Sequence, residues 1–183
     1  MSALLNSKDG YGVVSRWIHW SSALLIIALI VVGFKMSSME ASEVKYLLYG
    51  YHKQWGVVAG MLIFVRLIWL SNNPQVEAFK DAKWRMRCAK ITKKMLYFFM
   101  IAYPISGVIM SMAGGHGINF FGFQLPQFVE ENAEIAEMMH GLHNAMSWAF
   151  VMVISLHILA ALYHLHKLKD GLLPRMLGAK DAG

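Results

Sequence analysis

Residues 143–164 read HNAMSWAFVMVISLHILAALYH, a continuous apolar run interrupted by few polar side chains. At 1.5 Å per residue it is long and apolar enough to cross a hydrocarbon core of roughly 30 Å. It also contains two histidines, His143 and His157, which are separated by roughly 21 Å along a helix and by only about 40° in azimuth. Both imidazoles therefore lie on one face of a predicted membrane helix, at two depths. Such side chains are costly within a membrane and usually mark a function.

Three more apolar stretches precede this one, which gives four predicted membrane helices. This number indicates the fold class. The chain has 183 residues, of which 57% are hydrophobic and only 15% charged, far from the composition of a typical soluble domain. A lone cysteine, Cys88, excludes an internal disulfide. We therefore expect an all-α integral membrane four-helix bundle, a single transmembrane domain over residues 1–183. Its helices are predicted over about 11–36, 47–71, 92–113 and 138–166.

The distribution of charge predicts the orientation. Cytoplasmic segments retain Lys and Arg during insertion, whereas the connection 114–142 has neither and carries four glutamates. Basic residues gather near the two ends and between the second and third helices: Lys8, Arg16, Lys80, Lys83, Arg85, Arg87, Lys90, Lys93, Lys94, Lys167, Lys169, Arg175 and Lys180. Both termini are thus predicted to be cytoplasmic. Topology and attraction to anionic lipid explain the net charge of +6, which leaves a nucleic-acid partner without support.

Two more histidines complete a pattern of pairs. His19 lies near the inner end of the first predicted helix, the depth of His157, and His52 lies near the outer end of the second, the depth of His143. Pairs of imidazoles at two depths are what two stacked haem groups need as axial ligands. Zinc also accepts imidazole, but a zinc site collects its ligands at one point. His140 competes with His143, although its spacing from His157 turns it roughly 100° off the shared face.

Further residues are candidates for holding a cofactor, and each of them also has a purely structural explanation. Gly56, one turn after His52, leaves room for a flat macrocycle, as does Gly60; close helix packing explains them equally. Arg66 reaches the inner level on the face of His52, where it can pair with a haem propionate, or it snorkels to the interface. Arg16, Lys53 and His164 are further candidates for propionate, anion or quinone binding.

The segment GGHGINFFGFQLP, residues 114–126, mixes glycines with aromatic side chains. Aromatic rings favour the membrane interface. We expect a loop or a short helix at the outer surface, which covers what lies beneath it.

Several motifs together resemble one family. YGVVSRWIHW (residues 11–20), HKQWG (52–56) with Arg66, PISG (104–107) and the run from His143 to His164 are similar to those of the prokaryotic cytochrome b561 family, over essentially the whole chain. The resemblance implies two b-type haems ligated by His19, His52, His143 and His157. It also implies a multi-pass protein of the bacterial inner membrane and transmembrane electron transfer, commonly coupled to quinone. One branch of the family oxidises periplasmic superoxide and reduces ubiquinone.

Three classes of function follow. The first is an oxidoreductase that passes electrons from a small outer reductant such as superoxide to ubiquinone, and Lys53 is the best candidate for guiding an anion. The second is a cytochrome b membrane anchor that exchanges electrons between quinol and a periplasmic redox protein, and it predicts an exposed outer docking surface and co-purification of that partner. The third, a non-redox transporter or assembly protein, does not require histidines paired at two depths and predicts a colourless preparation.

Overall fold

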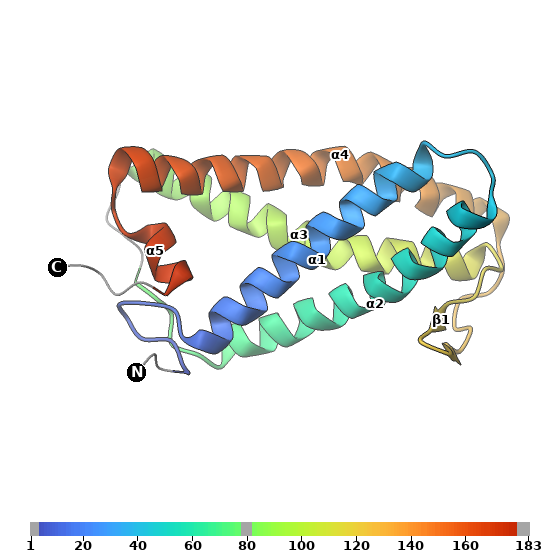
Figure 1. The fold of residues 1–183 in the computed structure, drawn as a ribbon, viewed down its shortest axis with the longest axis horizontal. Coiled ribbons are helices and arrows are strands. Elements are labelled where there is room, and N and C mark those ends of the chain that lie inside the picture. The colour runs from blue at the N-terminus through green and yellow to red at the C-terminus, as the bar shows by residue number, and fades with distance from the viewer. Residues whose placement is uncertain (1–3, 78–81, 179–183) are drawn as a thin grey trace. The chain divides into compact units, whose positions relative to one another are not determined.

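A computed structural model describes residues 4–77 and 82–178. Lys80 and Lys180, two of the basic residues used to predict the topology, lie outside the described residues. In chain order the elements are α1 (Val13–Ser37), α2 (Glu43–Ser71), α3 (Lys83–Ala113), β1 (Asn119–Phe120), β2 (Phe123–Gln124), α4 (Ala133–Tyr163), the π-helical turn η1 (His164–Leu168) and α5 (Leu172–Leu177) (Figure 1).

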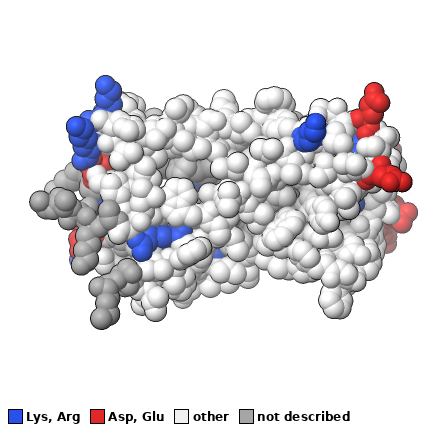
Figure 2. Space-filling model, in the orientation of Figure 1, with Lys and Arg blue, Asp and Glu red and all other residues white. Residues whose placement is uncertain are grey.

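Four of these helices, α1, α2, α3 and α4, are long and apolar enough to cross a membrane, the last of them continuing through η1 to Leu168. Many of their large apolar side chains are exposed, among them Leu24, Val31, Phe64 and Met152. Figure 2 shows that the face in view is mostly uncharged over the helices. Apolar side chains that point outward suit a lipid environment. The prediction of an all-α membrane protein with four spanning helices is confirmed.

Three of the helices begin earlier than the sequence predicted, α2 among them at Glu43 rather than near residue 47, whereas α1 begins slightly later, at Val13 rather than near residue 11. α3 begins at Lys83 rather than near residue 92, and α4 at Ala133 rather than near 138. Hydropathy marks only the part of a helix that suits hydrocarbon, whereas Lys, Arg, Met and Ala continue it beyond that part because they are good helix formers. The start of α4 also has a polar cap, since the backbone N–H of Ile135 donates to Oδ1 of Asn132 at 3.0 Å.

The C-terminal end of the fourth span departs from a regular helix. The α-helix ends at Tyr163, and a π-helical turn replaces the last predicted residues. The N–H of Lys169 donates to the carbonyl of His164 at 2.7 Å, and Lys169 adopts a left-handed φ of 50°. This turn redirects the chain toward α5.

The chain folds into two compact units, which we call the first and second unit. The first comprises residues 1–21, 64–97 and 150–183, and the second residues 22–63 and 98–149. Each long helix contributes to both. His19 and His157 belong to the first unit, and His52 and His143 to the second. Each predicted pair therefore has its own unit.

In the first unit, the segment before α1 is fastened by buried polar side chains. The indole N–H of Trp69 donates to Oγ of Ser15 at 2.7 Å, and Ser15 donates to Oδ1 of Asn6 at 2.6 Å. Oδ1 of Asn6 also accepts from the N–H of Gly12 at 3.0 Å, and its amide donates to the carbonyl of Pro74 at 3.2 Å. This network joins the start of α1 to the end of α2.

In the second unit, the segment predicted as a loop or short helix forms a small hairpin instead. β1 and β2 pair antiparallel through Asn119 with Gln124 and Phe120 with Phe123. Phe121 and Gly122 have φ values of 49° and 96°, the positive angles that a tight two-residue hairpin turn requires. The ring of Phe121 packs edge-on against Trp55 of α2, with ring centroids 5.6 Å apart. The hairpin therefore contacts α2 within one turn of His52.

Candidate haem-binding site

In the second unit, His52 of α2 and His143 of α4 face each other. Their ring centroids are 6.4 Å apart and the planes of the rings differ by 77°. Both rings are partly buried, whereas His140, the alternative to His143, is exposed. The structure therefore pairs His52 with the histidine that the helical spacing favoured.

Helix α3 contacts His143 through three residues of one turn. The hydroxyl of Ser106, which is 3% exposed, lies 2.9 Å from Nδ1 of His143. The phenol of Tyr103 donates to the carbonyl of His143 at 2.9 Å, and its ring lies 4.3 Å from the imidazole, centroid to centroid. At Gly107 an added Cβ would lie 3.3 Å from Cε1 of His143. A side chain at this position would push the ring by a few tenths of an ångström, so the glycine gives the imidazole its room.

His52 has a different environment. Its Nδ1 is buried and has no hydrogen-bond partner in the described part of the chain. A Cβ added at Gly33 of α1 would lie 3.4 Å from Cε1 of His52, so this ring too lies against a glycine of a neighbouring helix. Buried polar atoms in proteins are normally paired. Nδ1 of His52 lies on the edge of the ring nearest Gly33 and lacks the hydroxyl partner that Nδ1 of His143 has.

In the first unit, His19 of α1 and His157 of α4 repeat the distance of the other pair. Their ring centroids are 6.4 Å apart, and the ring planes differ by 66°. Nη2 of Arg66 donates to Nδ1 of His19 at 2.9 Å, and the guanidinium lies 5.9 Å from the ring centre of Tyr97. Arg66 therefore lies at this pair, at the level the sequence predicted.

Tyr11 adds a hydroxyl to the same surroundings. Burial raises its pKa above the ordinary value of 10.0; Tyr97 adds to this effect, and the guanidinium groups of Arg66 and Arg175 oppose it. Tyr11 is therefore a neutral hydroxyl at physiological pH, so the positive charge of Arg66 is not cancelled by a phenolate.

The spacing within each pair fits a shared metal ion. An imidazole nitrogen binds a transition metal at about 2 Å and lies roughly 1.1 Å from its ring centre, so imidazoles on opposite sides of one ion have centroids roughly 6.3 Å apart. Both pairs have 6.4 Å. In the described part of the chain, no three His, Cys, Asp or Glu side chains come together to hold a metal ion. The histidines gather as pairs, the arrangement of axial haem ligands.

The hydrogen bonds at Nδ1 distinguish the two pairs. A metal-binding imidazole usually donates its other N–H to an acceptor, and Ser106 offers such an acceptor to His143. Arginine has only donors, so Nδ1 of His19 accepts from Arg66. Ligation through Nε2 of His19 requires this contact to be given up, which would release the guanidinium for a carboxylate.

The remaining candidate residues make contacts of their own. The ammonium of Lys53 donates to the carbonyl of His116 at 3.4 Å. Nδ1 of His164 lies 2.5 Å from a carboxylate oxygen of Asp170, and the guanidinium of Arg16 lies against Gly178. A Cβ at Gly56 would meet nothing within 4 Å, whereas at Gly60 it would lie 3.3 Å from Pro104. Gly60 thus serves helix packing, and the backbone at Gly56 borders open space.

Four contact residues, Gly33, Tyr103, Ser106 and Gly107, were not among the sequence candidates. Ser106 and Gly107 belong to the PISG motif at residues 104–107, and Tyr103 directly precedes it. A proline followed closely by a glycine within an apolar helix was the available signal. The motif alone does not indicate which histidine ring lies against Gly107.

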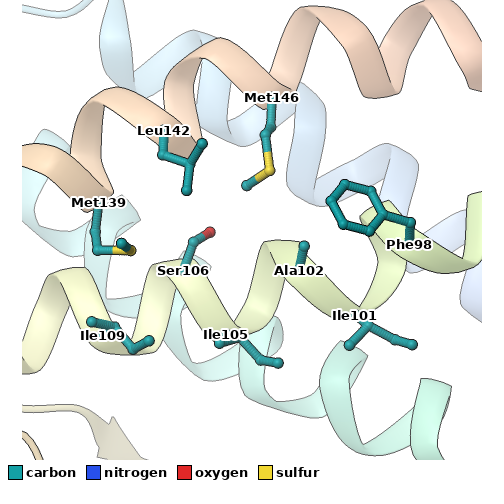
Figure 3. A pocket seen from close by; sticks show the side chains of 9 residues that line it. All are labelled: Phe98, Ile101, Ala102, Ile105, Ser106, Ile109, Met139, Leu142 and Met146. Carbon is teal, nitrogen blue, oxygen red and sulfur yellow. The ribbon is translucent and has the colours of Figure 1, made fainter. Parts of the chain in front are cut away.

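An apolar groove lies beside Ser106 in the second unit. It has a volume of about 480 Å³ and is formed by α3 and α4. Figure 3 shows Ser106, the only hydroxyl among its lining side chains, pointing from α3 toward α4 near Leu142. The groove therefore adjoins the residue that contacts His143.

Comparisons with known proteins agree with this geometry. The family model described as prokaryotic cytochrome b561 matches residues 10–179. Cytochrome b561 homolog 2 of Escherichia coli (strain K12) is 29% identical over 97% of this chain and 96% of its own length, and homolog 1 is 28% identical over 88% and 93%. A probable superoxide oxidase CybB of Yersinia pestis is 27% identical over 93% and 97%. The chain belongs to the prokaryotic cytochrome b561 family, whose members transfer electrons with b-type haem as multi-pass proteins of the bacterial inner membrane.

Proposed function

We propose that this chain carries electrons across the membrane through two b-type haems, one held by His19 and His157 and the other by His52 and His143. The observation that carries the proposal is the centroid distance of 6.4 Å within each pair, which fits two imidazoles on one iron. The whole chain, residues 1–183, then acts as one functional domain, with one haem in each compact unit.

The chain's own residues determine how such a site works. A haem with two axial imidazoles supplies one-electron redox chemistry without an open coordination position. The apolar helices keep water away and lower the dielectric constant around the pairs. Arg66, once released from His19, offers two parallel donors to a propionate. Arg16, Lys53 and His164 remain candidates for propionate or anion binding, and Gly56 for close approach of the macrocycle.

For the outer reductant we propose superoxide, with ubiquinone as the electron acceptor. The similarity to a probable superoxide oxidase, 27% identical over 93% of this chain, supports this assignment. Two superoxide anions give up one electron each and become two O₂ molecules, while one quinone takes up two electrons and two protons and becomes quinol. Lys53, beside His52, is the cation in the second unit that is best placed in sequence to attract an anion.

A second candidate is supported by the charge of the outer connection. Glu130, Glu131, Glu134 and Glu137 are exposed, and an acidic surface repels superoxide but attracts a basic protein. In this case the chain is a membrane anchor that exchanges electrons between quinol and a periplasmic redox protein.

The groove beside Ser106 is a candidate quinone site next to the haem of the second unit, so a quinone bound there exchanges electrons with that haem first. Its volume of about 480 Å³ lies within the usual range for small-molecule sites, roughly 300–1,000 Å³. We expect Ala102→Trp, which fills the groove from α3, to slow quinol formation while the haem spectrum stays unchanged. Ala145→Trp, at an exposed position of α4 outside the groove, is the matched control. Equal quinol formation by both variants would move the quinone site elsewhere.

The experiment that separates the two functions uses purified protein in detergent with added ubiquinone. We expect enzymatically generated superoxide to reduce the haems as fast as it is supplied and to yield one quinol for two superoxide anions. Haems that quinol reduces but superoxide does not would favour the membrane anchor. A preparation without haem would contradict both functions.

A further inference from the structure

Among the four candidate ligands, His143 has the most completely defined surroundings. Ser106, Tyr103 and Gly107 contact its ring and carbonyl from a single turn of α3. All four residues belong to the second unit. These contacts determine where the imidazole ring lies, and they can also determine which of its two nitrogens carries the proton.

The direction of the Ser106 hydrogen bonds follows from a count of donors. A serine hydroxyl has one proton and two acceptor lone pairs. The hydroxyl of Ser106 donates its proton to the carbonyl of Tyr103 at 2.9 Å. Toward Nδ1 of His143, also at 2.9 Å, it can then act only as an acceptor. The neutral imidazole therefore carries its proton on Nδ1 and leaves Nε2 with a free lone pair.

We propose that Ser106 is a positioning residue that holds His143 in the tautomer required for axial ligation, with Tyr103 and Gly107 fixing the place of the ring. The inference rests on the proposed function, because it assumes that His143 is a haem ligand. It goes beyond that function by assigning the affinity and the potential of one haem to a hydroxyl that does not touch the iron.

The expected effect has a definite sign. An acceptor on Nδ1–H increases the basicity of the ligating nitrogen, and a more basic ligand favours the oxidised iron. Ser106→Ala removes the acceptor, so we expect the midpoint potential of the haem at His52 and His143 to rise. A three- to tenfold change in the ratio of reduced to oxidised haem corresponds to roughly 30 to 60 mV for one electron.

Two further variants make the test specific. Ser106→Thr keeps the hydroxyl, which can still bond a carbonyl of the preceding turn, and its methyl group can enter the groove that Ser106 lines. Ser111→Ala makes the same chemical change on the same helix at equal burial, 3% exposed, but at a hydroxyl that bonds the carbonyl of His116 instead. We expect both variants to keep the wild-type potential.

The measurement is a redox titration of full-length protein in detergent, with low-spin haem signals recorded by electron paramagnetic resonance. We expect Ser106→Ala to change the potential and the signal of one haem only, and Ser106→Thr to keep the wild-type potential and signal of both haems. Wild-type potentials in Ser106→Ala, or an equal shift in Ser111→Ala, would overturn it. His143→Ala distinguishes the two proposals, because full haem content in that variant would overturn the proposed function itself.

Discussion

At the residue scale, the four histidines differ more in their neighbours than in their spacing. Both pairs have the same centroid distance, yet His143 faces a hydroxyl acceptor and His19 a cationic donor. Ligation of iron by His19 displaces Arg66 from Nδ1, but the guanidinium still belongs to the surroundings of this pair. Its positive charge disfavours oxidised iron and raises the potential of the haem, whereas an acceptor on the ligand lowers it. We therefore expect the haem of the first unit to have the higher potential.

Arg66→Leu tests the electrostatic part of this argument. A guanidinium paired with a haem propionate offsets its negative charge and so favours reduced iron. Loss of Arg66 should therefore lower the potential of the first-unit haem, on the order of tens of millivolts. Arg66→Lys, which keeps the charge, should retain most of the wild-type value. The argument fails if a redox titration gives equal potentials for the leucine and lysine variants.

Gly107→Val tests the packing of α3 against the ring of His143. An added Cβ would lie 3.3 Å from Cε1 of the ring, and overpacking of this kind typically costs about 1–3 kcal/mol. We expect haem quantification to show partial or complete loss of the second-unit haem and full retention of the other. Gly141→Val is the control, since a Cβ at Gly141 meets nothing within 4 Å. Two haems at wild-type potentials in Gly107→Val would refute the role of the glycine.

The sequence predicted the pairing of the histidines but not what surrounds them. The 14-residue spacing placed His143 and His157 on one face, because the geometry of a single helix determines it. Which glycine lies against which ring depends on how neighbouring helices are rotated about their axes, and one sequence does not contain that rotation. For this reason Gly56 and Gly60 were candidates, whereas Gly33 and Gly107 contact the rings.

At the scale of the elements, helix ends are held by polar side chains that hydropathy does not register. In the first unit, Ser15 accepts from Trp69 and donates to Asn6, so it joins α1, α2 and the segment before α1. Because hydropathy does not register polar segments, α3 and α4 begin earlier than predicted and the outer hairpin was not recognised. Its Phe121–Gly122 turn lacks the asparagine or aspartate that usually marks such turns.

Ser15→Ala should destabilise the first unit. The substitution leaves the indole of Trp69 and the amide oxygen of Asn6 without a shared partner, and an unsatisfied buried group costs about 1–3 kcal/mol. We expect a lower thermal unfolding midpoint in detergent with an unchanged haem spectrum. Ser21→Ala on the same helix is the control, because that hydroxyl is exposed and bonds the carbonyl of Trp17 in its own helix. Equal midpoints for the two variants would contradict the role of the network.

At the scale of the whole molecule, the number and length of the spanning helices were predictable because lipid requires long apolar segments. The orientation stays a prediction from charge. Lys and Arg gather near the two ends and in the connection 72–82 with the start of α3, whereas the connection 114–132 has neither. By the rule that positive loops stay inside, both termini are cytoplasmic and the hairpin is periplasmic.

Reporter fusions test this orientation. We expect a fluorescent protein at the C-terminus to fluoresce and alkaline phosphatase at the same position to be inactive. Alkaline phosphatase inserted after Pro126, beyond the hairpin, should be active because it folds in the periplasm. The opposite pattern would reverse the orientation and with it the assignment of His52 and His143 to the outer side.

Haem quantification on single His→Ala variants shows whether each histidine pair holds one haem. We expect two b-type haems per wild-type chain. His19→Ala and His157→Ala should lose the same haem, recognised by its potential, and His52→Ala and His143→Ala should lose the other. Full haem content in any of the four variants, or loss of different haems within one pair, would contradict the pairing.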